Sequence, residues 1–145
     1  MLKVFLVDDS SPVRRRLAAL ISALADVTIV GEAEDPDAAL CGIRMTGADL
    51  AIVDVHLAGG DGMTVVESLS RGTPPVFTMV LTNHSGPAFR AACRDAGADY
   101  FFDKTCEHEL ARETIMRLAK DKHRRSEQCG PASRTNRLVH RSGEK

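Results

Sequence analysis

The chain has 145 residues, of which 43% are hydrophobic and 27% are charged, and these values are typical of one globular domain. No apolar run approaches the roughly 20 residues that a membrane-spanning helix needs, and the N-terminus lacks the pattern of a secretory signal, so we expect a cytoplasmic protein. The net charge of −1 hides an asymmetry, because residues 1–119 carry a charge of −6 and residues 120–145 a charge of +5. Four cysteines without Cys-x-x-Cys spacing argue against a zinc site.

Short apolar runs alternate with helical patterns through the first 120 residues. In chain order, we predict a strand at 3–7, a helix at 11–24, a strand at 27–33, a helix at about 37–45 and a strand at 50–53. A glycine-rich loop follows, and then a helix around 63–69, a strand at 76–81, a helix at about 89–96, a strand at 100–102 and a helix at about 107–120. Ser11 is the expected N-cap of the first helix. Leu20 in the first helix and Leu110 in the last are expected to face the core.

Five strands that alternate with five helices predict an α/β fold with a doubly wound, five-stranded parallel sheet and helices on both faces. The strands agree with this fold because they are apolar nearly throughout, as in sheets that are buried on both sides. Residues 121–145 are rich in Arg and Ser and have too few apolar positions to form a core. We therefore predict a folded domain at 1–120 and a basic, disordered tail at 121–145.

Polar residues follow four of the predicted strands, at the edge where ligands bind in this kind of sheet. They are Asp8 and Asp9 after the first strand, Asp54 after the third, Thr82 after the fourth and Lys104 after the fifth. Each residue alone has an ordinary explanation as a turn, a helix cap, a strand end or a surface lysine. Their joint placement at the ends of four strands favours a functional site.

Physical chemistry suggests how this set would be used. Three clustered carboxylates repel one another and need a cation, and Mg²⁺ prefers such oxygen ligands. A bound Mg²⁺ and Lys104 would neutralise phosphoryl oxygens, and Thr82 would donate a hydrogen bond to another. Asp54 lies at the centre of the set and is the expected nucleophile. The residues therefore predict a phosphoryl-transfer site.

This combination resembles the receiver domain of bacterial two-component response regulators, in its stand-alone form, over residues 2 to about 119. The resemblance is carried by Phe-Leu-Val-Asp8-Asp9-Ser, Ile-Val-Asp54, Asp61-Gly62, Leu-Thr82, Ala-Gly-Ala-Asp-Tyr and Lys104. It implies a flavodoxin-like fold with Asp54 as the phosphorylated residue. It also implies a magnesium site made of Asp8, Asp9, Asp54 and the backbone carbonyl of His56. Thr82 and Phe101 match the switch hydroxyl and the switch aromatic residue of the family, and Lys104 matches its phosphoryl-binding lysine.

The resemblance further implies a phosphorelay response regulator that accepts a phosphoryl group from a sensor histidine kinase or a histidine phosphotransfer protein. Phosphorylation would change how a downstream protein binds the face formed by the helix at 89–96, the strand at 100–102 and the last helix. The expected chemistry is self-catalysed phosphoryl transfer with slow autodephosphorylation, not that of an enzyme. We expect no membrane partner and no specific binding of nucleic acid. Formation of a homodimer is left as an open alternative.

Three alternatives remain at this stage. The chain could relay or drain phosphoryl groups instead of acting on a target, or it could be a phosphorylation-independent adaptor that retains the fold. A hydrolase of the haloacid-dehalogenase type also uses an aspartate at a strand end, but it needs a second aspartate where this chain has His56.

The chain also departs from the family. Thr105 replaces the usual proline after Lys104, Ala58 replaces a common proline, and Asn83 replaces a small residue after Thr82. We expect these changes to affect the kinetics and the signalling conformation, and not the acceptance of a phosphoryl group on Asp54. The run 14–16 consists of three arginines and is predicted to be a solvated helix face, with kinase docking as the alternative.

Overall fold

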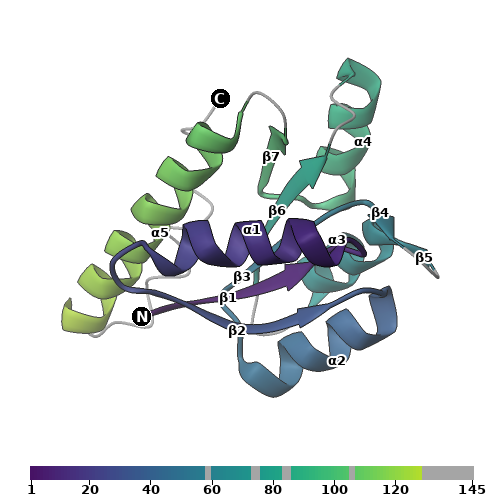
Figure 1. Cartoon of the computed structure of the whole chain (residues 1–145). Coiled ribbons are helices and arrows are strands. Elements are labelled where there is room, and N and C mark those ends of the chain that lie inside the picture. The colour runs from purple at the N-terminus through teal and green to yellow at the C-terminus, as the bar shows by residue number, and fades with distance from the viewer. Residues whose placement is uncertain (58–59, 73–75, 83–85, 105–106, 129–145) are drawn as a thin grey trace.

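The computed structural model describes residues 1–57, 60–72, 76–82, 86–104 and 107–128. Its main sheet consists of five parallel strands: β1 (Leu2–Val7), β2 (Val27–Ala33), β3 (Leu50–Val53), β6 (Phe77–Thr82) and β7 (Tyr100–Asp103). Their spatial order is β2-β1-β3-β6-β7 (Figure 1). The predicted doubly wound parallel sheet is therefore confirmed.

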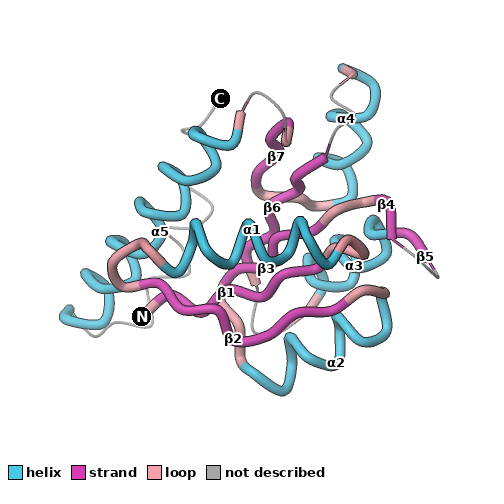
Figure 2. The backbone as a smooth tube through the Cα atoms, viewed as in Figure 1, coloured by secondary structure: helices cyan, strands magenta, loops and turns pink. Residues whose placement is uncertain are grey.

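Five helices cover the two faces of this sheet: α1 (Ser11–Ser22), α2 (Pro36–Thr46), α3 (Gly62–Arg71), α4 (Pro87–Ala96) and α5 (His108–Gln128). One core cluster joins the sheet to α2, α3 and α4 through residues such as Ile43, Val66 and Cys93. The other joins it to α1 and α5 through Ile21 and Leu118. Figure 2 shows the strands between these two layers of helices. The sheet is buried on both faces, which explains its nearly continuous apolar strands.

The register of the sheet brings the ends of its central strands together. Val7 at the end of β1 pairs with Val53 at the end of β3, and Val53 pairs with Val80 of β6. The chain runs outward from β1 to β2 in one direction, whereas β3, β6 and β7 extend in the other. The crevice where this order reverses is the usual place for a ligand in an open α/β sheet. In this chain it lies just beyond Val7 and Val53.

Two local features differ from the sequence-based expectations. Ser10, and not Ser11, is the N-cap of α1, and its hydroxyl accepts a hydrogen bond from the N–H of Val13 at 3.4 Å. The loop after β3 contains two short strands, β4 (His56–Leu57) and β5 (Gly60–Asp61), which pair antiparallel. A ladder of two residues is too short for sequence alternation to indicate it.

The last helix is longer than predicted, because α5 continues to Gln128 instead of ending at residue 120. Lys122 explains part of this extension: its ammonium group lies 2.5 Å from Asp49 Oδ2 and donates to the carbonyl of Met1 at 2.8 Å. Such contacts are formed between elements far apart in the sequence, so the helical periodicity could not reveal them. Residues 129–145, the rest of the predicted disordered tail, lie outside the described residues.

Two leucines that were expected in the core are exposed. Leu20 keeps 45% of its surface accessible and Leu110 keeps 48%, while Ile21 and Ala111 beside them are buried. A shift of one residue turns a helical side chain by about 100°, so a small error in the predicted stripe moves a leucine to the surface. Within the described residues, no helix is both long enough and apolar enough to span a membrane.

Candidate functional site

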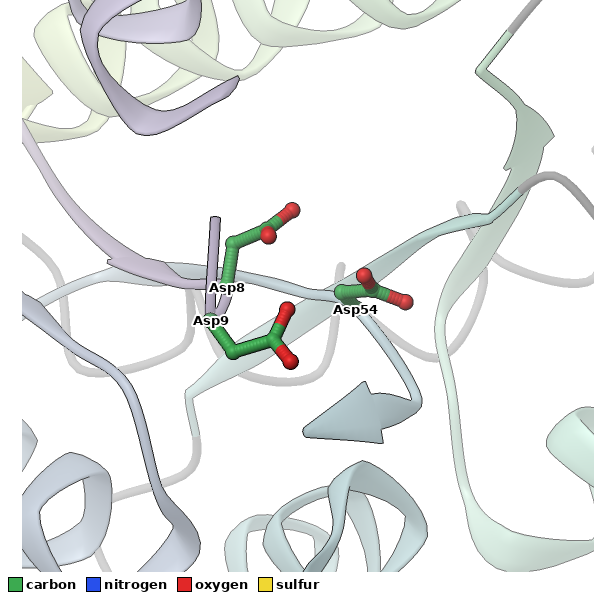
Figure 3. Close-up of side chains that lie close together, drawn as sticks. All are labelled: Asp8, Asp9 and Asp54. Atoms are coloured by element: carbon green, nitrogen blue, oxygen red, sulfur yellow. The ribbon is translucent and has the colours of Figure 1, made fainter. Parts of the chain in front are cut away.

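Three carboxylates lie together at the carboxyl ends of β1 and β3. Oxygen atoms of Asp8, Asp9 and Asp54 all lie within 4.8 Å of one another. Figure 3 shows these side chains next to each other beyond the strand ends. Asp8 is buried, Asp9 is exposed, and the side chain of Asp54 is 12% exposed. The cluster is therefore reached from solvent, and its oxygen atoms are the kind of donor that Mg²⁺ prefers.

The backbone holds Asp54 firmly. Its N–H donates to the carbonyl of Val7 at 2.8 Å, which extends the pairing of β1 with β3 by one residue. On its other side, the start of α3 packs directly against the backbone of Asp54. A Cβ atom on Gly62 would lie 2.3 Å from the carbonyl oxygen of Asp54 and 2.6 Å from Cα of Val55. Only glycine allows this approach, so Gly62 helps to fix where the Asp54 carboxylate lies.

Lys104 joins the acidic cluster from the loop after β7. Its ammonium group donates to Asp8 Oδ2 at 2.8 Å and to Asp54 Oδ2 at 3.0 Å. The N–H of Lys104 donates to the carbonyl of Thr82 at 2.8 Å, which fixes the start of this side chain beside β6. Asp8 is held further by the N–H of Ser10, which donates to Asp8 Oδ1 at 2.9 Å.

Electrostatics keeps Lys104 charged. Burial alone would lower the pKa of Lys104, but hydrogen bonds and charge attraction from Asp8 and Asp54 outweigh it, so the pKa is raised. One ammonium group faces three carboxylates, and the cluster therefore keeps an excess of negative charge. This excess and the oxygen-only donor set fit a divalent cation of the magnesium type.

The predicted switch residues lie on β6 and β7. Thr82 is the last residue of β6, is 1% exposed and pairs in register with Asp103. Phe101 is half-buried in β7 and packs against the core cluster on the side of α4. Its ring meets that of Phe89 edge to face, with 6.0 Å between the centroids.

An ion pair beside Phe101 was not anticipated from the sequence. The guanidinium carbon of Arg90 lies 4.6 Å from the centroid of the Phe101 ring, and Arg90 Nη2 lies 2.7 Å from Glu107 Oε1. The same oxygen of Glu107 accepts the N–H of Asp103 at 2.9 Å. That hydrogen bond and the charge of Arg90 lower the pKa of Glu107 despite the opposing effect of burial. These contacts connect α4, β7 and the start of α5.

Arg14 was predicted to lie on a solvated face, and this prediction was wrong. Its side chain is only 13% exposed, whereas Arg15 and Arg16 are exposed as expected. Arg14 lies next to the acidic cluster and pairs with Glu32 Oε1 at 2.9 Å. Glu32 and Glu34 lie two positions apart at the end of β2, so their side chains point to the same face. This spacing in the sequence could have indicated an acidic partner for Arg14.

Other predicted positions are only partly described. The backbone of His56 starts β4 and pairs with Asp61, which is the N-cap of α3. Ala58, Asn83 and Thr105, where the chain departs from the family pattern, lie outside the described residues. Cys93 is buried, and desolvation, followed by the charge of Asp61, raises the pKa of its thiol.

Known proteins with similar sequences are response regulators and related signalling proteins. The family model described as "Response regulator receiver domain" matches residues 4–116. The DNA-binding transcriptional activator DevR/DosR of Mycobacterium tuberculosis is 34% identical over 113 residues, which cover 77% of this chain and 52% of that protein. A protein-glutamate methylesterase/protein-glutamine glutaminase of Hahella chejuensis is 30% identical over 142 residues, which cover 91% of this chain and 37% of that protein. The chain thus spans about half the length, or less, of these relatives.

Solved structures support the same fold. The signal receiver domain described as that of the response regulator NarL from Mycobacterium tuberculosis superposes with a TM-score of 0.75 at 27% identity. This match covers 82% of the present chain and 96% of that one. A two-component response regulator of the LuxR family from Aurantimonas sp. SI85-9A1 gives the same TM-score at 25% identity, over 81% of this chain and 84% of that one.

Proposed function

Because this chain belongs to the family of response regulator receiver domains, we propose that it accepts a phosphoryl group on Asp54 in a Mg²⁺-dependent reaction. One observation carries this proposal: Asp8, Asp9 and Asp54 have oxygen atoms within 4.8 Å of one another, and Lys104 bonds two of the three carboxylates. The relatives are longer proteins whose names include DNA-binding and methylesterase activities, and those activities belong to them.

Asp54 is the proposed nucleophile. One of its carboxylate oxygens attacks the phosphorus atom of a phosphohistidine on the donor protein. A P–O bond forms, the P–N bond breaks, and the electron pair returns to the imidazole nitrogen, which takes up a proton from solvent. The 12% exposure of the Asp54 side chain supports this assignment, because a donor has to reach it from outside.

Asp8 and Asp9, together with Asp54 and the carbonyl of His56, are the groups that would hold Mg²⁺. When bound, the ion would neutralise charge on the transferred phosphoryl oxygens. Lys104 already lies 3.0 Å from Asp54 Oδ2, so its ammonium group needs only a small movement to contact a phosphoryl oxygen on that carboxylate.

Thr82 and Phe101 are the proposed switch. The hydroxyl group of Thr82 would donate a hydrogen bond to the phosphoryl group, and Phe101 would move together with Thr82. These movements would change the face formed by α4, β7 and α5, where a downstream protein would bind. The contacts of Phe101 with α4 support this part of the proposal, because movement of the ring has to break or remake them. The proposed donor is a sensor histidine kinase or a histidine phosphotransfer protein.

The proposal is tested by incubating the protein with labelled acetyl phosphate and Mg²⁺. We expect label that is lost in both acid and base, as for an acyl phosphate, and no label without Mg²⁺. Asp54→Asn should abolish the signal, and Asp95→Asn, a matched change on the exposed side of α4, should leave it intact. Persistent labelling of Asp54→Asn would refute the site, whereas a wild-type chain that never takes up label would indicate an adaptor.

A further inference from the structure

Arg14 links α1 to the loop that carries two of the three carboxylates. Its Nη1 donates to the backbone carbonyl of Asp8 at 2.5 Å. Its other contacts are with acidic side chains at the end of β2: Nε lies 2.9 Å from Glu32 Oε1, and Nη1 lies 3.4 Å from Glu34 Oε1. The guanidinium group is thus held by two carboxylates while it binds a carbonyl that lies directly beside the candidate metal site.

The carbonyl of Asp8 and the N–H of Asp9 belong to one planar peptide unit. A partner that fixes the carbonyl therefore fixes the direction in which the chain continues to Asp9. The carboxylate of Asp8 has its own anchors, because Ser10 N–H and the Lys104 ammonium group donate to its two oxygens. Asp9 is exposed, so the position of its carboxylate depends on the conformation of this loop.

We propose that Arg14 is a positioning residue for the cation site: it holds the Asp8–Asp9 peptide so that the Asp9 carboxylate faces Asp54. This inference rests on the proposed function, because it concerns the same Mg²⁺ site. Arg14 acts through the backbone and is not expected to contact the ion or the phosphoryl group. Charge-assisted hydrogen bonds such as those of Arg14 are about twice as strong as neutral ones, which suits a group that has to keep a loop in place.

A purely electrostatic effect of Arg14 would have the opposite sign. A positive charge near three carboxylates opposes the binding of a cation, so its removal would tighten binding. If Arg14 acts by positioning, its removal weakens binding instead, because Asp9 no longer lies where the ion needs it. The sign of the change in metal affinity therefore separates the two effects.

The experiment uses the full chain and Mn²⁺, whose electron paramagnetic resonance signal counts the free ion directly. Arg14→Met keeps the aliphatic stem and removes every donor, and Arg14→Lys keeps the charge but cannot reach one carbonyl and two carboxylates at once. Arg16→Met on the exposed side of α1 is the matched control. We expect both Arg14 variants to raise the Mn²⁺ dissociation constant about tenfold, as loss of outer-shell partners of metal ligands does elsewhere, and the control to leave it unchanged.

A second readout separates positioning from chemistry. In phosphorylation by acetyl phosphate, the Mg²⁺ concentration for half-maximal rate should rise about tenfold in Arg14→Lys, in line with the weaker binding, while the rate at saturating Mg²⁺ stays within about twofold of wild type. Circular dichroism and urea unfolding without metal verify that the variants are folded. Metal affinity that is unchanged or tighter in a folded Arg14 variant would overturn the inference and leave the proposed function intact. Absence of Mn²⁺ binding by the wild-type chain would overturn both.

Discussion

Lys104 provides the sharpest test of the electrostatics of the acidic cluster. Its ammonium group lies 2.8 Å from Asp8 Oδ2 and 3.0 Å from Asp54 Oδ2, and its side chain is 17% exposed. Lys104→Met keeps most of the side-chain volume and removes the ammonium group that binds these two carboxylates. The acidic cluster then loses the positive charge of Lys104.

The magnitude follows from these distances. At an effective dielectric constant of about 20, each pair has a gross Coulomb energy of about 5–6 kcal/mol, most of which is offset by the cost of removing the charges from water. Removal of one partner of a buried ion pair typically costs about 3–5 kcal/mol. Because solvent reaches Asp9 and the edge of the cluster, we expect Lys104→Met to lose about 2–3 kcal/mol of unfolding free energy at pH 7.5 without metal.

The assay is urea unfolding followed by circular dichroism, with and without Mg²⁺. Mg²⁺ should stabilise Lys104→Met more than wild type, because the cluster without its lysine has a stronger demand for a cation. Lys120→Met, at an exposed position of α5, is the control and should change stability by less than about 0.5 kcal/mol.

Two results would refute this reasoning. The first is equal stability of Lys104→Met and wild type in metal-free buffer. The second is the same stabilisation of both proteins by Mg²⁺. Either result would mean that the lysine does not balance the charge of the cluster.

Two further predictions concern the supports of the site and of the switch face. Gly62→Ala would place a methyl group 2.3 Å from the carbonyl oxygen of Asp54, so we expect the unfolding free energy measured in urea to fall by about 1–3 kcal/mol and phosphorylation to become slower. Gly72→Ala is the control and should be tolerated, because its added atom would lie 3.4 Å from the nearest neighbour. The pKa of Glu107 is lower in the folded state than in the unfolded chain. Its carboxylate therefore stabilises the fold above about pH 4.3, the ordinary pKa of glutamate, and this stabilisation is lost as the pH falls through the pKa of the folded state. The unfolding free energy of wild type should therefore decrease more steeply between about pH 5 and pH 3 than that of Glu107→Gln; equal slopes would show that the contact with Arg90 and the backbone does not persist in solution.

The sequence by itself determined the fold class and the residues at the strand ends. Alternating apolar runs and helical stripes are local patterns, and they suffice to predict a parallel sheet because the central strands β1, β3 and β6 are buried on both faces. Once the strands are parallel, the positions after them have to lie at one edge. The structure indeed brings Asp8, Asp9, Asp54 and Lys104 together there.

Only the tertiary structure decided which side chains support that edge. The environment of Arg14 depends on carboxylates that stand on another strand, and the length of α5 depends in part on the contact of Lys122 with Asp49. The exposure of Leu110 depends on how its helix is rotated against the sheet. The spacing of apolar residues predicts this rotation only to within one residue. Local patterns report what a segment prefers, whereas these features arise from distances between segments that folding alone brings together.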